Sequence, residues 1–145
     1  MKRLAMALVI LSFVCPAYGD GDDQVVVGLV NKALEFFKTQ GKDPALKIIG
    51  ASAGPLRKGA VYAFALDFKG RMIAHPVQED LRSQDAWELQ NAKGKFITQE
   101  FIKIAKEKGE GWCEYWWIRV GETAPTLKKS FIKGDIIFDL PRFLA

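Results

Sequence analysis

The sequence predicts an α+β domain in which a long N-terminal helix packs across one antiparallel sheet. Two observations lead to this class. The apolar residues of 24–40 repeat at helical spacing, whereas residues 60–68 alternate between two faces as a strand does. A second amphipathic helix over 96–109 is then followed by strands that return through short turns. Helices grouped on the faces of an antiparallel sheet are typical of α+β domains, and 145 residues suit one such domain.

The first residues have the pattern of a secretory signal peptide. Two basic residues precede an apolar run over 4–14, and small residues close the segment at Gly19. We therefore expect a leader over 1–19, cut after Gly19, and a mature periplasmic or secreted domain over 20–145. An uncleaved membrane anchor is the weaker alternative, because a helix needs roughly 20 apolar residues to cross a bilayer.

The cysteines and the charge narrow the classes of partner. Cys15 could carry the lipid of a lipoprotein. However, the bulky Phe13 and Val14 precede it, where a lipoprotein signal has small residues. Cys113 is then the only cysteine of the mature chain, so we expect it to be buried or to form an intermolecular disulfide. Without its leader the chain is nearly neutral and has no basic run, which makes nucleic acid an unlikely class of partner.

Further elements follow from turn residues and periodicity. We predict a short helix from Asp43-Pro44 to Gly50, strands over 60–68 and 71–76 joined by Lys69-Gly70, strands over 112–120 and 127–133, and a Gly134-Asp135 turn into a last strand over 136–140. The polar stretch 77–95 interrupts this series as an excursion of short helical turns. A connection of that length inside a compact domain is more often functional than idle.

The strand "WCEYWWIRV" carries aromatic residues on both faces. Alternation places one set on one side: Trp112, Glu114, Trp116, Ile118 and Val120. The other set is Cys113, Tyr115, Trp117 and Arg119. Neither face suits solvent, so we expect one to meet the N-terminal helix and the other to lie beneath 77–95. A small-molecule pocket between strand and excursion is one interpretation, and a purely structural core is the other.

The chain carries no recognisable catalytic motif. It has no nucleophile elbow, phosphate-binding loop or dinucleotide fingerprint, and its single histidine, His75, with scattered carboxylates gives no metal-ligand spacing. We therefore predict no catalytic residues, no metal and no cofactor, and rank an enzyme last. His75 ends a strand where the excursion begins, a position where binding sites are often built, although a lone histidine is more often structural.

An ordered set of residues over 24–133 resembles the type 2 single Cache domain of bacterial sensors. The matching residues are Tyr62, Asp67, Gly70, Ala74, His75, Pro76, Gly94, Lys95, Phe96, Gly111, Trp112, Tyr115, Trp117 and Lys129. The resemblance implies a PAS-like fold with a long N-terminal helix on a five- to six-stranded antiparallel sheet and a helical capping excursion. It also implies extracytoplasmic binding of a small organic acid such as acetate, propionate, lactate or pyruvate.

The resemblance places the ligand between the sheet and the capping segment. The candidate ligand-binding residues are Tyr62, Arg71, His75, Trp112, Tyr115, Trp117 and Lys129. We expect Lys129, helped by His75 or Arg71, to hold the carboxylate, because a partly buried anion needs a charge-assisted donor. The tyrosines would supply hydroxyl groups, and a tryptophan would pack on the alkyl part.

Two features depart from the family pattern. Family members usually lie between two membrane spans and precede a kinase or chemotaxis module, and their last strand is glycine-rich where this chain reads "KGDIIFDLPRFLA". We therefore expect a stand-alone exported sensor domain that presents a small organic acid to a membrane-bound sensor or chemoreceptor. The alternative is a non-catalytic dimerisation or interaction module that uses the aromatic strand, with a homodimer through Cys113 or the N-terminal helix.

Overall fold

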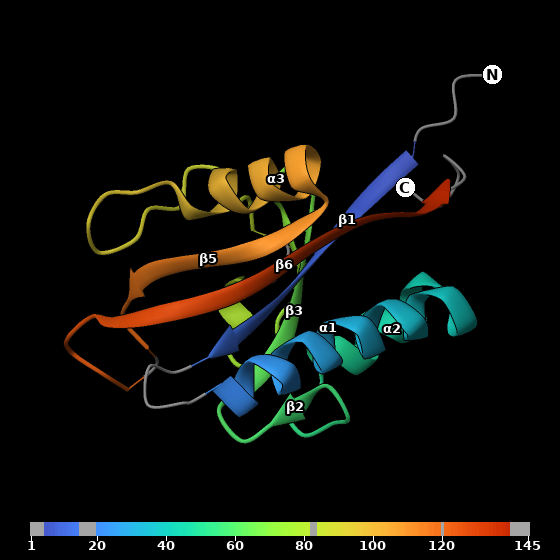
Figure 1. The fold of residues 1–145 in the computed structure, drawn as a ribbon, viewed down its shortest axis with the longest axis horizontal. Helices are drawn as coiled ribbons and strands as arrows, with labels where there is room; N and C mark the ends of the chain where they lie inside the picture. The colour runs from blue at the N-terminus through green and yellow to red at the C-terminus, as the bar shows by residue number, and fades with distance from the viewer. Residues whose placement is uncertain (1–4, 15–19, 82–83, 120, 140–145) are drawn as a thin grey trace.

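The structure is a computed structural model that describes the backbone of residues 5–14, 20–81, 84–119 and 121–139. Side chains are described from residue 23 onward, except at 79 and 135–139 and at the gaps in those ranges. One antiparallel sheet forms the centre of the molecule. Figure 1 shows two helices on one face of this sheet and a third helix on the opposite face. The α+β class with an N-terminal helix on an antiparallel sheet is thereby confirmed.

The sheet has six strands in the described part of the chain, in the order β2-β3-β1-β6-β5, and β4 pairs with β3. The strands are β1 (Ala5–Val14), β2 (Arg57–Lys58), β3 (Val61–Asp67), β4 (Met72–Ala74), β5 (Glu110–Trp117) and β6 (Thr126–Asp139). Every strand pair is antiparallel. The β3–β4 hairpin turns at Gly70, which has a φ of 83° and lies where the sequence predicts a tight turn.

The central strand β1 is the apolar segment that the sequence analysis assigns to a signal peptide. It pairs with β3 from Leu8 to Ser12 and with β6 from Ala5 to Val14. A continuous apolar run is also the pattern of a strand covered on both faces, which explains how one segment fits both roles. The predicted cut after Gly19 lies outside the described residues and stays a prediction.

The helices form where the periodicity predicts them. They are α1 (Asp20–Gln40), α2 (Lys42–Gly50) and α3 (Ile97–Lys108), with a 3-10 turn, η1 (Glu79–Leu81), in the excursion. The residues predicted to face inward on α1 are all buried: Val26, Val30, Ala33, Leu34 and Phe37. The predicted start of α2, with Asp43 as the cap and Pro44 as the first helical residue, is wrong by two residues. Gly41 caps the helix with a φ of 86° and no side-chain cap forms, so Asp43 lies within the first turn.

The predicted turn at Gly134-Asp135 is wrong. β6 continues through both residues and is paired to β1 from Lys129 to Asp139. The glycine has a different purpose, because a Cβ at position 134 would lie 2.7 Å from the Cβ of Ala105 on α3. The backbone N–H of Gly134 also donates to the carbonyl of Gly109, at 2.8 Å. Gly134 therefore lets α3 approach β6 closely, a role for which short-range sequence pattern carries no signal.

The two faces of the sheet hold separate apolar clusters. On one face, α1 and α2 pack on the small residues of β3, with Phe131 buried in this cluster and Trp112 partly buried against it. On the other, α3 packs against a cluster that includes Tyr62, Tyr115 and Ile132. The excursion contributes Leu81, Ala86 and Leu89 to this second cluster, which confirms that it covers the sheet.

Candidate functional site

The register of β5 and β6 decides which aromatic face lies beneath the excursion. Tyr115 pairs with Lys128, and Glu114 pairs with Lys129. Because directly opposed residues share a face, Tyr115, Trp117 and Lys128 project toward α3 and the excursion. Trp112 and Lys129 project toward α1.

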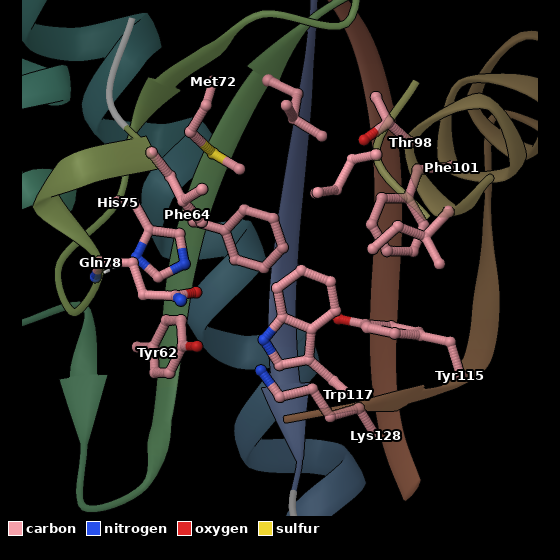
Figure 2. Close-up of a pocket in the computed structure, with 14 residues that line it drawn as sticks. Tyr62, Phe64, Met72, His75, Gln78, Thr98, Phe101, Tyr115, Trp117 and Lys128 are labelled. Atoms are coloured by element: carbon pink, nitrogen blue, oxygen red, sulfur yellow. Dashed lines mark hydrogen bonds between the residues drawn. The ribbon is translucent and has the colours of Figure 1, made fainter. Parts of the chain in front are cut away.

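An inner cavity lies on the α3 side of the sheet, with a volume of about 30 Å³. Its walls come from β3, β4, the excursion, α3, β5 and β6, and Figure 2 shows their side chains converging. The lining is mainly apolar, and its aromatic part includes Phe64 from β3, Phe101 from α3, and Tyr115 and Trp117 from β5. A cavity of this size holds one or two water-sized groups, so a methyl or a short alkyl group is the largest part of a ligand that fits.

An outer cavity of about 160 Å³ adjoins the inner one. Both are lined by Tyr62, Gln78, Trp117 and Lys128, which we call the neck residues. Beyond the neck the outer walls are Arg57, Ala60, Val77 and Arg119. The described lining residues of the two cavities include several cations and no aspartate or glutamate.

Hydrogen-bond donors gather at the neck. The ammonium of Lys128, a residue only 6% exposed, lies 6.0 Å from the Tyr62 ring centroid and 5.7 Å from that of Trp117. In Figure 2 the Tyr62 hydroxyl, the Gln78 amide, the Trp117 indole nitrogen and the Lys128 ammonium point toward the same space. Lysine and tryptophan side chains only donate, so this space favours a ligand rich in acceptor atoms.

His75 is fixed at the edge of the inner cavity. Its Nδ1 accepts hydrogen bonds from the backbone N–H groups of Val77 at 3.2 Å and Gln78 at 2.9 Å. A neutral imidazole in this setting carries its proton on Nε2, since Nδ1 acts as the acceptor. Figure 2 shows this second nitrogen on the side of the ring that faces the cavity. The ring also contacts Tyr62 and Phe64, with centroids 5.2 Å away in each case.

The two tyrosines of the site are neutral hydroxyl groups. Burial raises the pKa of Tyr62 to about 12, against the lowering effect of the Arg57 and Arg119 charges. Burial also raises the pKa of Tyr115 well above its ordinary value, although its hydrogen bond to Ser130 works in the opposite direction. The Tyr115 hydroxyl lies 2.8 Å from the Ser130 hydroxyl. Both tyrosines therefore remain hydrogen-bonding groups, not anions, at neutral pH.

The structure brings four of the seven candidate ligand-binding residues together at the cavity: Tyr62, His75, Tyr115 and Trp117. Three lie elsewhere. Lys129 forms an ion pair with Asp23 of α1 at 2.7 Å and lies 4.3 Å from the Trp112 ring centroid, so both face the opposite side of the sheet. Arg71 lies at the β3–β4 turn, where its exposed side chain is outside the cavity lining and its backbone bridges to Asp85.

Sequence reasoning missed Lys128 and Gln78. The signal for Lys128 was present as alternation in "LKKSFIK", which puts Lys128 and Lys129 on opposite faces. Which of the two shares a face with Tyr115 depends on the β5–β6 register. Gln78 had no signal, because its place follows from the path of the excursion after His75.

The arrangement matches a known family. A family model described as a Cache domain matches residues 31–138, which is most of the chain. The chain belongs to the Cache domain family. Cache domains are sensor modules of chemoreceptors, and this assignment confirms the resemblance seen in the sequence.

Solved structures support the Cache fold. The periplasmic sensor domain of a chemotaxis protein has 22% identity and a TM-score of 0.58, with 79% of this chain and 90% of that chain covered. A Cache chemosensory domain described for its carboxylic acid recognition has 20% identity and a TM-score of 0.55, with 77% and 87% covered. A methyl-accepting chemotaxis protein from Vibrio parahaemolyticus has 18% identity and a TM-score of 0.58, with 79% and 89% covered.

A curated relative gives the sequence-level comparison. The methyl-accepting chemotaxis protein McpP of Pseudomonas putida is 28% identical over 72 residues. The match covers 50% of this chain and 13% of that protein, so the Cache chain spans a small part of the relative's length. No helix in the described part of the chain is long and apolar enough to cross a membrane.

Two aromatic side chains of β5 in this Cache domain pack on other rings of the same domain. Trp112 lies 5.1 Å from Phe131, and Tyr115 lies 5.3 Å from Phe101, measured between ring centroids. Cys113 is buried, as predicted, and burial raises the pKa of its thiol to about 11. A dimer linked through this thiol would need an atom that the fold covers.

Proposed function

We propose that this Cache domain is a sensor module that binds a small organic acid of the acetate, propionate, lactate or pyruvate class and carries out no chemistry on it. The observation that carries the proposal is the buried Lys128 ammonium among the donor groups of the neck. The ligand carboxylate would lie at the neck and its alkyl part in the inner cavity.

The chemistry of the lining supports a carboxylate. A buried anion needs charge-assisted hydrogen bonds to replace its hydration, and Lys128 provides the charge. Tyr62 and Trp117 add O–H and N–H donors beside it, and His75 offers Nε2–H from the inner side. The small aromatic inner cavity limits the alkyl part to about one or two carbon atoms.

The comparisons support a sensor in a chemoreceptor pathway. Chemotaxis receptors recur among the similar proteins, and one similar Cache domain is described for carboxylic acid recognition. We therefore infer an extracytoplasmic location and a membrane-bound chemoreceptor or sensor as the partner. Intact mass measurement of the chain recovered from a periplasmic extract tests the location. An N-terminus at Asp20 is the result that the predicted cut requires, and an intact N-terminus is the result that the central place of β1 in the sheet requires.

Two neighbouring lysines give a matched pair of variants for the binding test. Titration calorimetry with acetate, propionate, lactate and pyruvate should detect binding of at least one acid to the unaltered protein. Lys128→Gln should weaken that binding about tenfold or more, because it removes the charged partner of the carboxylate. Lys129→Gln removes the same charge from the opposite face and should leave the affinity unchanged.

Circular dichroism and thermal melting would show that both variants fold. His75→Gln is a second test inside the cavity, since it keeps a polar group but loses the fixed Nε2–H donor. Binding of no acid in the series, or equal binding by the Lys128→Gln variant and the unaltered protein, would refute the proposal.

A further inference from the structure

A buried threonine lies at the end of the inner cavity farthest from the neck. Thr98 is the second residue of α3, lines the cavity and is only 1% exposed. Figure 2 shows it away from the neck residues, with its hydroxyl oxygen on the side that faces the other lining side chains. Within the described part of the chain, this hydroxyl forms no hydrogen bond. Thr98 therefore points an unpaired polar group into the cavity.

A threonine in a helix usually has a partner nearby. Its hydroxyl commonly donates to the backbone carbonyl one turn earlier, as Thr39 of α1 does to the Glu35 carbonyl at 2.9 Å. Thr98 forms no such bond with the residues that the structure describes. A buried hydroxyl without a partner is unfavourable, and a valine of nearly the same shape would avoid this cost. Thr98 is therefore suited to a partner that enters the cavity from outside.

The surroundings of Thr98 in the fold offer no polar side chain of their own. Ile97 and Phe101 come from the same helix, and Leu89 of the excursion joins them through the hydrogen bond from the Ile97 N–H to its carbonyl, at 3.2 Å. The polar lining residues gather at the neck and at the His75 edge of the cavity. The hydroxyl of Thr98 is thus the polar contact that a ligand meets at this end.

The start of α3 favours an oxygen atom at the same place. Phe96 precedes the helix, and no side chain caps it. The first N–H groups of a helix lack partners within the helix and give this end a partial positive charge. Ile97 and Thr98 bring this end of the helix to the cavity wall. An acceptor oxygen would receive the Thr98 hydroxyl proton and would also lie at the favourable end of the helix dipole.

We propose that Thr98 determines which small acid binds, and that it selects acids with a hydroxyl or oxo oxygen on their alkyl part. This inference rests on the proposed function and narrows its ligand class. The carboxylate lies at the neck, and the additional oxygen of the ligand forms a hydrogen bond with the Thr98 hydroxyl. Acetate and propionate lack this oxygen and leave the hydroxyl unpaired.

The size of the inner cavity agrees with a ligand of this kind. Its volume of about 30 Å³ holds one or two water-sized groups, such as one carbon atom and one oxygen atom. A hydroxyl or oxo oxygen is no larger than a methyl group, so both kinds of acid fit and hydrogen bonding distinguishes them. A site that bonds a ligand oxygen rejects the analogue without it, because the polar group of the site is then left unpaired.

Three-carbon acids separate the oxygen atom from chain length. Titration calorimetry would compare propionate with lactate, 3-hydroxypropionate and pyruvate. We expect the unaltered protein to bind at least one oxygenated acid about tenfold or more tightly than propionate. Thr98→Val should abolish this preference, because valine keeps the shape and loses the hydroxyl. Thr98→Ser should retain the preference, since serine keeps the hydroxyl.

Thr39→Val is the matched control, because it removes a threonine hydroxyl from the exposed end of α1. It should leave the affinities for all four acids unchanged. Thermal melting without ligand gives a second measurement. The Thr98→Val variant should melt at the same temperature as the unaltered protein or higher, since it removes an unpaired buried hydroxyl. A clearly lower melting temperature would show that the hydroxyl has a structural partner, which contradicts the inference.

The binding results separate this inference from the proposed function. If the acids bind and propionate binds as tightly as the oxygenated acids, the role of Thr98 is wrong while the proposed function stands. If Thr98→Val weakens the binding of propionate and of the oxygenated acids by the same factor, the role of Thr98 is again wrong. Absence of binding by every acid overturns both proposals.

Discussion

Lys128 and Lys129 are neighbours in the chain and face opposite sides of the sheet. Lys128 lies in the neck of the cavities, 5.7 Å from the centroid of the Trp117 ring, whereas Lys129 pairs with Asp23 of α1 at 2.7 Å. One lysine thus serves the candidate binding site, and the other ties the N-terminal helix to β6.

Loss of the Lys129–Asp23 ion pair should cost little stability. The two side chains are 31% and 37% exposed, so solvent screens their attraction. We expect Asp23→Asn to lower the free energy of unfolding by about 0.5 kcal/mol. Lys129→Gln should cost about 1 kcal/mol, since it also removes the contact with the Trp112 ring. Urea unfolding of both single variants and the double variant measures the coupling, and a coupling of several kcal/mol would contradict this account.

Gly134→Ala should destabilise the domain. The new methyl group would lie 2.7 Å from the Cβ of Ala105 and 3.2 Å from its Cα, so α3 and β6 would have to separate. Overpacking of this kind costs about 1–3 kcal/mol. Gly28→Ala is the control, because a Cβ there meets nothing within 4 Å and alanine favours a helix, which predicts a small stabilisation. Adding Ala105→Gly to the Gly134→Ala variant should restore part of the loss in thermal melting.

Stability should fall as the pH rises above about 9. Burial raises the pKa of the Cys113 thiol to about 11 and that of Tyr62 to about 12, so the folded protein keeps protons that the unfolded chain releases. For each group, the stabilisation is complete at pH values below its pKa in the unfolded chain. It is lost as the pH rises from that pKa to the pKa of the same group in the folded protein. Each group contributes a slope of up to about 1.4 kcal/mol per pH unit.

Urea unfolding at intervals between pH 8 and 11 measures this slope. Cys113→Ala and Tyr62→Phe should each make the curve shallower, since each removes one of the groups. A free energy of unfolding that stays constant over this range would contradict the burial of these groups. Thiol-reactive reagent at pH 8 should label Cys113 slowly in the folded protein and rapidly in urea.

A chain that begins at Asp20 should be less stable than the full chain. Removing β1 leaves the backbone groups of β3 and β6 that it pairs with facing a gap in the centre of the sheet. We expect a lower urea midpoint and faster amide exchange along Ala63–Asp67. Equal stability of the two chains would show that residues 1–19 are dispensable to the fold, as a removable leader requires.

The sequence predicted the elements well where one face of an element is apolar over several turns or alternations. Phe37 on α1 and Phe101 on α3 lie inside because burial of a helical stripe dominates the local energetics. It failed where a residue's role depends on a distant neighbour. From the sequence, Gly134 is predicted to be a turn residue, and only the structure shows Ala105 beside it. The apolar run over 5–14 fits both an export signal and a central strand.

Alternation in the chain by itself determined that the strand 112–117 carries aromatic residues on both faces, and the order of its motifs determined the family. The expectation that both faces are buried is wrong for the Trp112 face, where Glu114 and Ile118 are exposed. The tertiary structure decided which face lies beneath the excursion and which lysine accompanies it. The physical reason is the two-residue period of a strand, by which a shift of one position in the β5–β6 register exchanges Lys128 for Lys129. That register depends on how the sheet packs between α1 and α3, which no short stretch of sequence encodes.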